Sequence, residues 1–253
     1  MLKIEKFVTA SPEQMEMVIE GMRNPKNSWD RMDSGAIDCD HMSCDDCPAH
    51  VLEVCSDRPQ YDFFLGPDDH KLMMSLAKGG PVHAKYRRMM PVWVTINAPL
   101  YWWKEFDTYK VGTVANSCST MHKIGEKEFT LEDFSHEHLI DADDPLLTVG
   151  EVVSLITLEI VISALNFYRN KFLKAKTKPM KDESKRAGLV KKYWWQMIQL
   201  LPTSYMQKRT VFLNYEVLYA MRKDRRHHKL DEWHVFCDWI ENLPYSELIT
   251  LER

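Results

Sequence analysis

Glycine placement is the feature that most constrains what this chain can fold into. The 253 residues contain 9 glycines, well below the usual share of about 7%. No three of them fit the spacing G-x-G-x-x-G or G-x-x-x-x-G-K-[ST]. A dinucleotide-binding Rossmann turn or a P-loop needs glycines at those spacings, because the backbone must approach phosphate closely. The glycine pattern therefore argues against both kinds of phosphate-binding turn.

Charge and hydropathy favour a cytoplasmic protein without a membrane or nucleic-acid partner. The formal net charge is −4, so nothing global favours nucleic acid or an anionic membrane. The longest apolar stretch, Val152 to Leu165, is interrupted by polar residues and is too short to span a bilayer. The N-terminus has no apolar signal region, and six cysteines are too few for a secreted disulfide scaffold.

Helix signals dominate, with one clear strand. Ser11-Pro12-Glu13-Gln14 forms a capping box with proline at the first helical position, and it predicts a helix. A second helix is predicted over Asp68 to Lys78, stopped by Gly79-Gly80. Val92 to Asn97 alternates as a strand with its aliphatic side chains on one face, and Pro99 can start an aromatic-rich helix.

The second half is predicted to be helical with irregular connections. Thr148-x-x-Glu151 reads as another capping box, opening a long helix to about Lys178. Two further helices are expected near Thr210 to Lys223 and Asp231 to Asn242. Val111 to Ser119 is small and hydroxylated, which suits a ligand-lining loop. We therefore expect a helix-dominated α/β (α+β-like) fold in one domain, 1–253, with a Cys-rich insertion at about 35–60 and a basic loop at about 174–192.

Four cysteines form a candidate metal site. Cys39, Cys44, Cys47 and Cys55 lie within seventeen residues. The spacing Cys39-x4-Cys44-x2-Cys47 lets two thiolates reach one ion, which suits structural zinc. The same run also imitates plant-type [2Fe–2S] spacing, and ordinary thiols in a solvated loop are the third interpretation.

Two further features bear on ligand binding. Cys118 lies between Ser117 and Ser119 and four residues before His122, so it is either a nucleophile or part of a small-residue lining, which we favour. Its neighbours' hydroxyls and backbone N–H groups can hold a phosphate or a base edge. In the basic C-terminal segment, Arg225 follows an apolar helix face by one turn and can clamp a phosphate. The other basic residues of that segment read as a solvated surface.

Two blocks of the chain together resemble the flavin-dependent thymidylate synthases. The first runs from Leu76-Ala77-Lys78-Gly79-Gly80-Pro81-Val82-His83 through the strand to Ala98-Pro99 and on to Ser119. It is similar to that family's glycine–histidine turn, strand, Ala-Pro, helix, Arg-His-Arg signature and serine-containing loop. The second block resembles the family's Leu-Pro, Tyr-Thr-Gln, Asn-Ala-Arg-Ser-Leu and later helix arginine, through Leu201-Pro202, Tyr205, Gln207, Asn214, Leu218 and Arg225.

The resemblance implies a subunit with a small antiparallel sheet packed by long helices, assembled as a homotetramer with FAD held between subunits. It implies conversion of dUMP to dTMP with methylenetetrahydrofolate as carbon donor and NADPH as reductant, without an enzyme cysteine attacking the pyrimidine. By position, His83, Tyr109, Lys110 and Asn214 would line the flavin. Ser117, Cys118, Ser119, Gln207 and Arg225 would meet the pyrimidine deoxynucleotide.

The chain departs from the family pattern at charged positions. Thr108-Tyr109-Lys110 stands where the family has Arg-His-Arg, Glu216 replaces the arginine of Asn-Ala-Arg, and Ile198 replaces another phosphate-binding arginine. Each lost charge-assisted contact is worth about 1.5–3 kcal/mol. Three interpretations follow: a synthase with a rebuilt phosphate site, a relative acting on another pyrimidine nucleotide, or a flavin-free remnant used for nucleotide binding or protein interaction, of phage or nucleotide-metabolism type. A synthase with a cysteine nucleophile is a more distant alternative.

Overall fold

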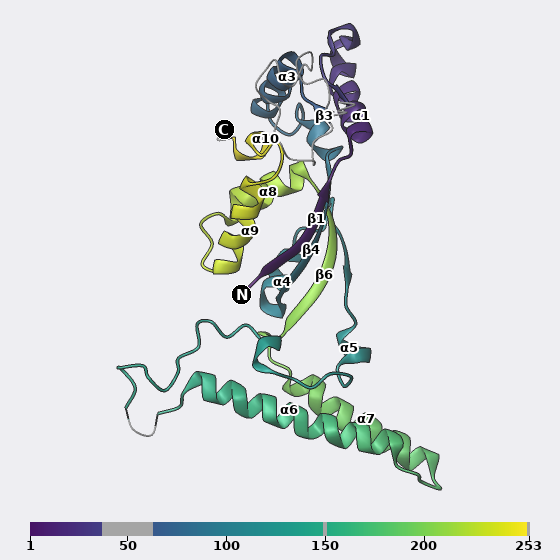
Figure 1. Ribbon diagram of the computed structural model, residues 1–253, viewed down its shortest axis with the longest axis vertical. Coiled ribbons are helices and arrows are strands. Elements are labelled where there is room, and N and C mark those ends of the chain that lie inside the picture. The colour runs from purple at the N-terminus through teal and green to yellow at the C-terminus, as the bar shows by residue number, and fades with distance from the viewer. Residues whose placement is uncertain (37–62, 149–150, 252–253) are drawn as a thin grey trace, which may run out of the picture. The chain divides into compact units, whose positions relative to one another are not determined.

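A computed structural model describes residues 1–36, 63–148 and 151–251 (Figure 1). Within these residues, short 3-10 turns occur at Asn24–Lys26, Trp29–Arg31, Lys85–Arg88 and Leu131–Asp133. The strands and helices are, in chain order, β1 (Lys3–Thr9), α1 (Pro12–Arg23), β2 (Gly35–Ala36), β3 (Phe63–Phe64), α3 (Pro67–Lys78), β4 (Pro91–Pro99), α4 (Leu100–Phe106), β5 (Val114–Ser117), α5 (Thr120–Lys123), α6 (Ser154–Thr177), α7 (Glu183–Leu200), β6 (Met206–Asn214), α8 (Tyr215–Arg225), α9 (Asp231–Glu241) and α10 (Glu247–Thr250).

Helices dominate the structure, and the strands form a small antiparallel sheet. The predicted helix-dominated class is therefore confirmed. Four strands are ordered β1-β4-β6-β5, and β2 pairs separately with β3, Gly35 opposite Phe64. The strand predicted over Val92 to Asn97 is the middle of β4. Its aliphatic residues alternate with outward ones because successive side chains of a strand point to opposite faces: Val92 and Val94 are buried, whereas Trp93 is exposed.

The chain divides into two compact units. The first unit comprises Met1–Lys3, Ile96–Thr108 and Asn116–Arg209, and the second comprises Ile4–Thr95, Tyr109–Ala115 and Thr210–Arg253.

The first unit is built around the hairpin of α6 and α7, which lie along one another (Figure 1). The basic loop predicted at about 174–192 is wrong. The helix α6 continues through Thr177 and α7 begins at Glu183, so residues 178–182 alone connect them. Asp182 caps α7, because its side chain accepts a hydrogen bond from the Lys185 N–H at 3.1 Å. The core of this unit gathers Ile124, Phe129, Phe134, Leu158, Ile162, Leu165, Phe172 and Met197.

The start of α6 also differs from the prediction. The Glu151 carboxylate does accept a hydrogen bond from the Thr148 N–H at 2.8 Å, as a capping box requires. The helix nevertheless begins at Ser154, after Val153 in extended conformation. The Thr148–Glu151 pair therefore closes a local turn rather than capping the helix.

In the second unit, α10 contacts α3, α8 and α9, and α1 contacts the 3-10 turn Lys85–Arg88, which also contacts α8. Ser11 caps α1 as predicted, with its capping box to Gln14 formed. A buried ion pair joins α1 to α3: Arg23 Nε donates to Asp69 Oδ1 at 2.5 Å. Asp69 Oδ2 also accepts from the backbone N–H groups of Asp33 and Ser34, each at 3.0 Å. The carboxylate is thereby satisfied in a buried position.

Two segments that were predicted as helix or loop are strands in the structure. Residues 210–214, expected to be helical, complete β6, and α8 starts at Tyr215. Val211 and Leu213 are buried while Thr210 is exposed, which is the alternation of a strand. Part of the segment expected to be a loop, Val114–Ser117, forms the edge strand β5. Across residues 1–36, 63–148 and 151–251, no helix is both long and apolar enough to cross a bilayer.

Candidate functional site

The second unit holds an arginine beside two aromatic rings that contact each other. Arg225, the last residue of α8, donates from Nε to the Tyr109 hydroxyl at 2.9 Å. Its guanidinium carbon lies 5.1 Å from the centroid of the Trp233 ring and 5.5 Å from that of Tyr109. Trp233 is buried on α9, and its ring meets Tyr109 edge to face at 6.2 Å. Two rings and a hydroxyl thus fix the guanidinium at the end of the helix.

Burial raises the pKa of this tyrosine. Desolvation raises the pKa of the Tyr109 phenol above its ordinary value of 10.0, and the nearby Arg225 offsets this only in part. The phenol is therefore neutral at pH 7, so it keeps a hydroxyl hydrogen while its oxygen accepts from Arg225.

Asn214 and Lys110 lie near the same turn. Asn214 caps α8, its Oδ1 accepting from the Val217 N–H at 3.1 Å. Gly112 has φ +78°, and a Cβ built there would lie 3.0 Å from Asn214 Nδ2. The turn that carries Lys110 thus approaches the Asn214 amide closely, which glycine permits. The Lys110 side chain itself is exposed.

His83 lies in the turn after α3. Its side chain is exposed, and its backbone N–H donates to the Gly80 carbonyl at 3.0 Å. The ring lies against Gly79, where an added Cβ would meet it at 3.1 Å. Of the four residues predicted to line a flavin, three therefore share the region of Tyr109, Gly112 and α8, and His83 comes from a separate turn.

In the first unit, the predicted nucleotide-binding loop is the end of β5 and the start of α5. The Cys118 N–H donates to the Lys208 carbonyl at 2.9 Å, which continues the pairing of β5 with β6. Ser119 caps α5 by accepting from the His122 N–H. Ser117, Cys118 and Ser119 are all exposed, and Cys118 carries a free thiol.

Gln207 connects this loop to residues that the site prediction did not include. Its Nε2 donates to Thr120 Oγ1 at 3.1 Å, and its Oε1 accepts from Arg209 Nε at 2.9 Å. The Arg209 guanidinium also binds Asp107 at 2.7 Å and lies 4.3 Å over the Trp103 ring. Gln207 and Arg209 are two apart on β6, so strand alternation was the signal that could have paired them.

Two departures from the family pattern have structural roles here. Glu216 accepts from Nε of the buried Arg87 at 2.8 Å, while Arg87 Nη1 donates to the Leu248 carbonyl at 2.9 Å. The carboxylate at position 216 therefore holds a buried cation. Ile198 packs against the core of the first unit, an apolar setting in which an arginine would be desolvated.

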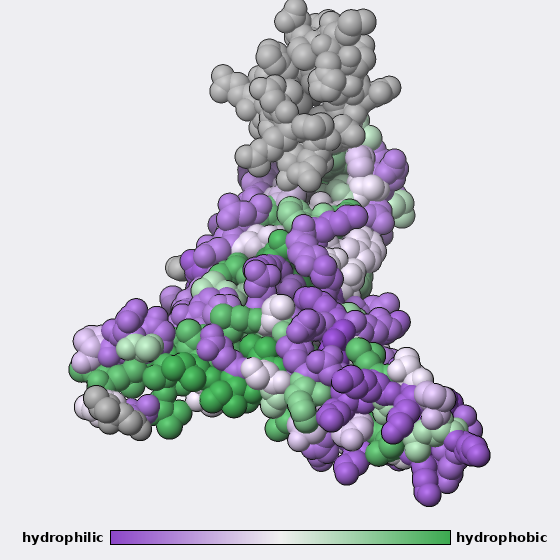
Figure 2. All heavy atoms as spheres, turned by 60° about the horizontal axis from the view of Figure 1, so that its bottom comes forward, coloured by the Kyte–Doolittle hydropathy of each residue, from purple (hydrophilic) through white to green (hydrophobic). Residues whose placement is uncertain are grey.

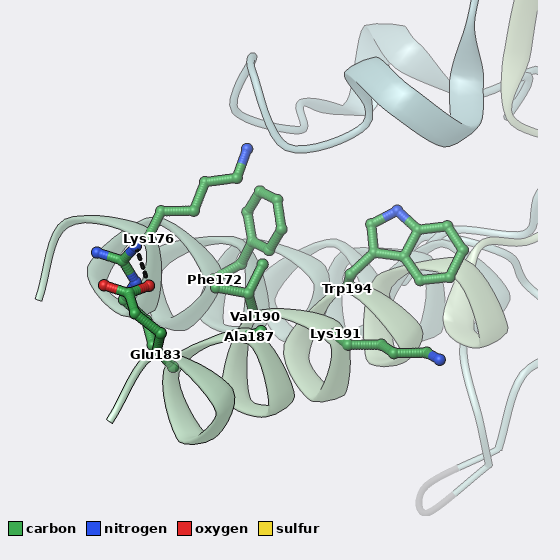
Figure 3. A pocket seen from close by; sticks show the side chains of 8 residues that line it. Phe172, Lys176, Glu183, Ala187, Val190, Lys191 and Trp194 are labelled. Carbon is green, nitrogen blue, oxygen red and sulfur yellow. Dashed lines mark ion pairs between the residues drawn. The ribbon is translucent and has the colours of Figure 1, made fainter. Parts of the chain in front are cut away.

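A cavity of about 430 Å³ opens between α6 and α7 near their connection. Figure 3 shows Phe172 of α6 and Val190 of α7 among its lining residues, with the ion pair of Glu183 and Arg186 at one end. None of the predicted site residues that the structure describes lines this cavity. The predicted zinc ligands Cys39, Cys44, Cys47 and Cys55 lie outside the described residues, and within the described part no cluster of potential metal ligands was found.

No protein-family model and no curated protein sequence matches the chain. Solved structures, in contrast, match over nearly its whole length. A flavin-dependent thymidylate synthase, ThyX, from Helicobacter pylori, complexed with FAD and dUMP, aligns with a TM-score of 0.52 and 13% identity, over 98% of this chain and 97% of that one. A second structure of the Helicobacter pylori protein with FAD and dUMP gives 0.53 and 11%, over 99% and 100%.

The third match is a UMP/dUMP methylase, PolB, from Streptomyces cacaoi, bound with 5-Br dUMP. It aligns with a TM-score of 0.52 and 11% identity, over 99% of this chain and 94% of that one. Similarity at such low identity is evidence on the fold. The resemblance noted in the two sequence blocks is thus matched by the arrangement of the whole chain, which has the fold of the flavin-dependent thymidylate synthases.

Proposed function

We propose that this protein binds FAD and a pyrimidine deoxynucleotide and methylates the nucleotide, converting dUMP to dTMP or acting on a close relative of dUMP. The carbon donor would be methylenetetrahydrofolate and the reductant NADPH. The observation that carries the proposal is Arg225, held beside Tyr109 and Trp233 in a chain whose fold matches structures complexed with FAD and dUMP.

The residues of the second unit have the chemistry that a phosphorylated aromatic ligand requires. Arg225 and Lys110 supply positive charge, the Tyr109 hydroxyl and the Asn214 amide supply hydrogen bonds, and aromatic rings lie beside them. Because the rings fix the Arg225 guanidinium in advance, little entropy is lost when it meets a phosphate. We assign Arg225 to the nucleotide phosphate, and His83, Tyr109, Lys110 and Asn214 to the flavin, which supplies the hydride chemistry when bound.

The first unit would contribute hydroxyls rather than a nucleophile. Ser117 and Ser119 expose their side chains beside Cys118, and Gln207 is held in place by Thr120 and Arg209. By the resemblance, we assign these groups to a pyrimidine deoxynucleotide. The resemblance further implies a homotetramer with the flavin between subunits, which suits a chain that lacks a glycine-rich phosphate turn.

The test combines absorption with binding and turnover. Purified protein, as isolated or after incubation with FAD, is expected to show flavin absorption, to bind dUMP by calorimetry, and to form dTMP detectable by mass spectrometry. Arg225→Gln should weaken dUMP binding by about tenfold to a hundredfold, the loss of one charge-assisted contact. Arg226→Gln is the matched control, since Arg226 pairs with Asp238 on the surface. Protein that stays colourless with FAD and binds no dUMP contradicts the proposal.

A nucleotide-binding or protein-interaction module without catalysis is the second candidate. Glu216 favours it, because the position where the resemblance expects a phosphate-binding arginine is committed to the buried Arg87. A nucleotide-binding module predicts dUMP binding that depends on Arg225, with no flavin absorption and no dTMP formed. A protein-interaction module predicts that dUMP does not bind either.

A further inference from the structure

The cavity between α6 and α7 combines an apolar lining with positive charge. Phe172, Ala187, Val190 and Trp194 supply the apolar part of the lining. Its volume of about 430 Å³ falls in the range of cavities that bind small molecules, about 300–1,000 Å³. The cavity belongs entirely to the first unit, and none of the residues assigned to FAD or to the deoxynucleotide lines it. It is therefore a separate candidate for a ligand site.

The two aromatic side chains of the cavity are held in place by α5 and the turn after it. Trp194 Nε1 donates to the Met121 carbonyl at 2.9 Å, and its ring meets that of Trp195 edge to face, with the centroids 4.8 Å apart. Phe172 packs against Gly125, where an added Cβ would lie 2.7 Å from the ring. Because both rings are already fixed, a ligand would lose little binding free energy in ordering them.

Positive charge exceeds negative charge around this cavity. Among its described lining residues, Lys176, Arg186 and Lys191 are basic and Glu183 alone is acidic. Glu183 pairs with Arg186 at 2.5 Å, so no other described carboxylate of the lining is left to neutralise Lys176 and Lys191. In Figure 2, which brings the bottom of Figure 1 forward, hydrophilic side chains gather toward the end where α6 and α7 are joined. The cavity therefore suits an anionic ligand.

Each of the two helices presents an ammonium group near an aromatic ring (Figure 3). On α6, the Lys176 ammonium lies 4.4 Å from the centroid of the Phe172 ring, and the lysine is exposed. On α7, the exposed Lys191 precedes Trp194 by three residues, which puts both on one side of the helix. Aromatic and cationic groups together are the chemistry that a ligand with a flat ring and a phosphate chain requires.

We propose that this cavity binds a nucleoside polyphosphate, with the base against Trp194 and Val190 and the phosphates on Lys176 and Lys191. Two ammonium groups on separate helices call for more than one phosphate, and an aromatic side chain can stack on any base. None of the described lining residues carries an amide or a hydroxyl that could read the edge of a base, so purine and pyrimidine nucleotides should bind alike. The proposal does not depend on the proposed function, because the two involve different residues.

Calorimetry with ATP tests the site, in protein incubated with excess FAD and dUMP so that ATP is kept out of the sites proposed for them. Wild-type protein should bind ATP, and Lys176→Gln/Lys191→Gln should raise the dissociation constant at least about tenfold, because two charge-assisted contacts are lost. The matched control, Lys174→Gln/Lys192→Gln, removes two exposed lysines of the same helices that do not line the cavity, and should change it less than about twofold. Wild-type protein that binds no ATP, or an equal effect of the two variants, would overturn the proposal.

Two fragments of ATP separate the contribution of the ring from that of the phosphates. Adenosine and tripolyphosphate should each bind at least about tenfold more weakly than ATP, since each lacks half of the expected contacts. Tripolyphosphate that binds as tightly as ATP would show a cluster of cations without a base pocket, and would overturn the proposal.

Lysine acetylation followed by peptide mass spectrometry locates the bound ATP. ATP should protect Lys176 and Lys191 from acetylation and leave Lys174 and Lys192 reactive. Protection of Lys110 without protection of Lys176 and Lys191 would place ATP at the proposed flavin site instead, and would overturn the assignment to this cavity.

Discussion

Replacing Asp69 by asparagine is expected to lower the free energy of unfolding by about 3–5 kcal/mol, the usual cost of breaking a buried ion pair by removing one partner. The structure gives the reason. Arg23 is 3% exposed and Asp69 is fully buried, so the guanidinium would stay in the interior without its countercharge. The carboxylate of Asp69 now accepts hydrogen bonds from several donors, including the N–H groups of Asp33 and Ser34. The NH2 group of an asparagine would face one of these donors and could not accept its hydrogen bond.

Urea unfolding followed by circular dichroism at pH 7 measures this effect. The midpoint should fall while the slope with urea stays the same, since the surface exposed on unfolding is unchanged. Glu126→Gln is the control: Glu126 pairs with Lys123 on the surface, and losing such a pair costs at most about 1 kcal/mol. A loss below about 1 kcal/mol for Asp69→Asn would refute the reasoning from buried charge.

The same carboxylate predicts a dependence on pH. Burial raises the pKa of Asp69, but hydrogen bonds from Ser34, Arg23 and Asp33 outweigh it, so the pKa lies below the ordinary value of 3.8. The unfolded chain therefore binds the proton more readily. The contribution of Asp69 to stability is complete above the unfolded pKa and is lost as pH falls through the lower folded pKa. The difference between wild type and Asp69→Asn should accordingly narrow in acid.

Three further predictions concern single positions. Gly112→Ala should lower stability by about 1–3 kcal/mol, because φ is +78° and the new Cβ would lie 2.8 Å from Val217, whereas Gly188→Ala, with open space inside α7, should raise the melting temperature slightly. Maleimide at pH 8 should label Cys118 but not Cys237 in native protein, as peptide mass spectrometry can show, since burial raises the pKa of Cys237 to about 11. Cys118→Ser should retain turnover of dUMP; complete loss would indicate a cysteine nucleophile instead.

Short sequence signals predicted the helices and strands whose formation depends on residues close by in the sequence. The capping box at Ser11, the glycine stop after Lys78 and the alternation of Val92 and Val94 all depend on neighbours within a few residues, and α1, α3 and β4 follow them closely. The end of β6 was not predicted, because the helix expected near Thr210 to Lys223 covers Val211 and Leu213. Those two residues alternate, but sheet pairing, which a single sequence does not reveal, decides between the two patterns.

The candidate site could be predicted in parts. The resemblance named Tyr109 and Arg225 as site residues, but their contact was not predicted, because 116 residues separate them in the sequence. Trp233 and Arg209 were not predicted, since each acts through a tertiary contact across one unit. The first part of α7 was predicted as a loop, because this segment is highly charged and contains Gly188. Its stability comes from apolar residues packed on α6, such as Met197, rather than from propensity.

The pair of Arg87 and Glu216 limits how this site could be changed. Glu216→Arg alone would set two guanidinium groups against each other in the interior, beside the ring of Tyr219, which lies 4.4 Å from the Arg87 guanidinium carbon. An arginine at position 216 thus becomes tolerable once Arg87 is also replaced, for example by methionine. An arginine can therefore be introduced at position 216 only together with a substitution at position 87.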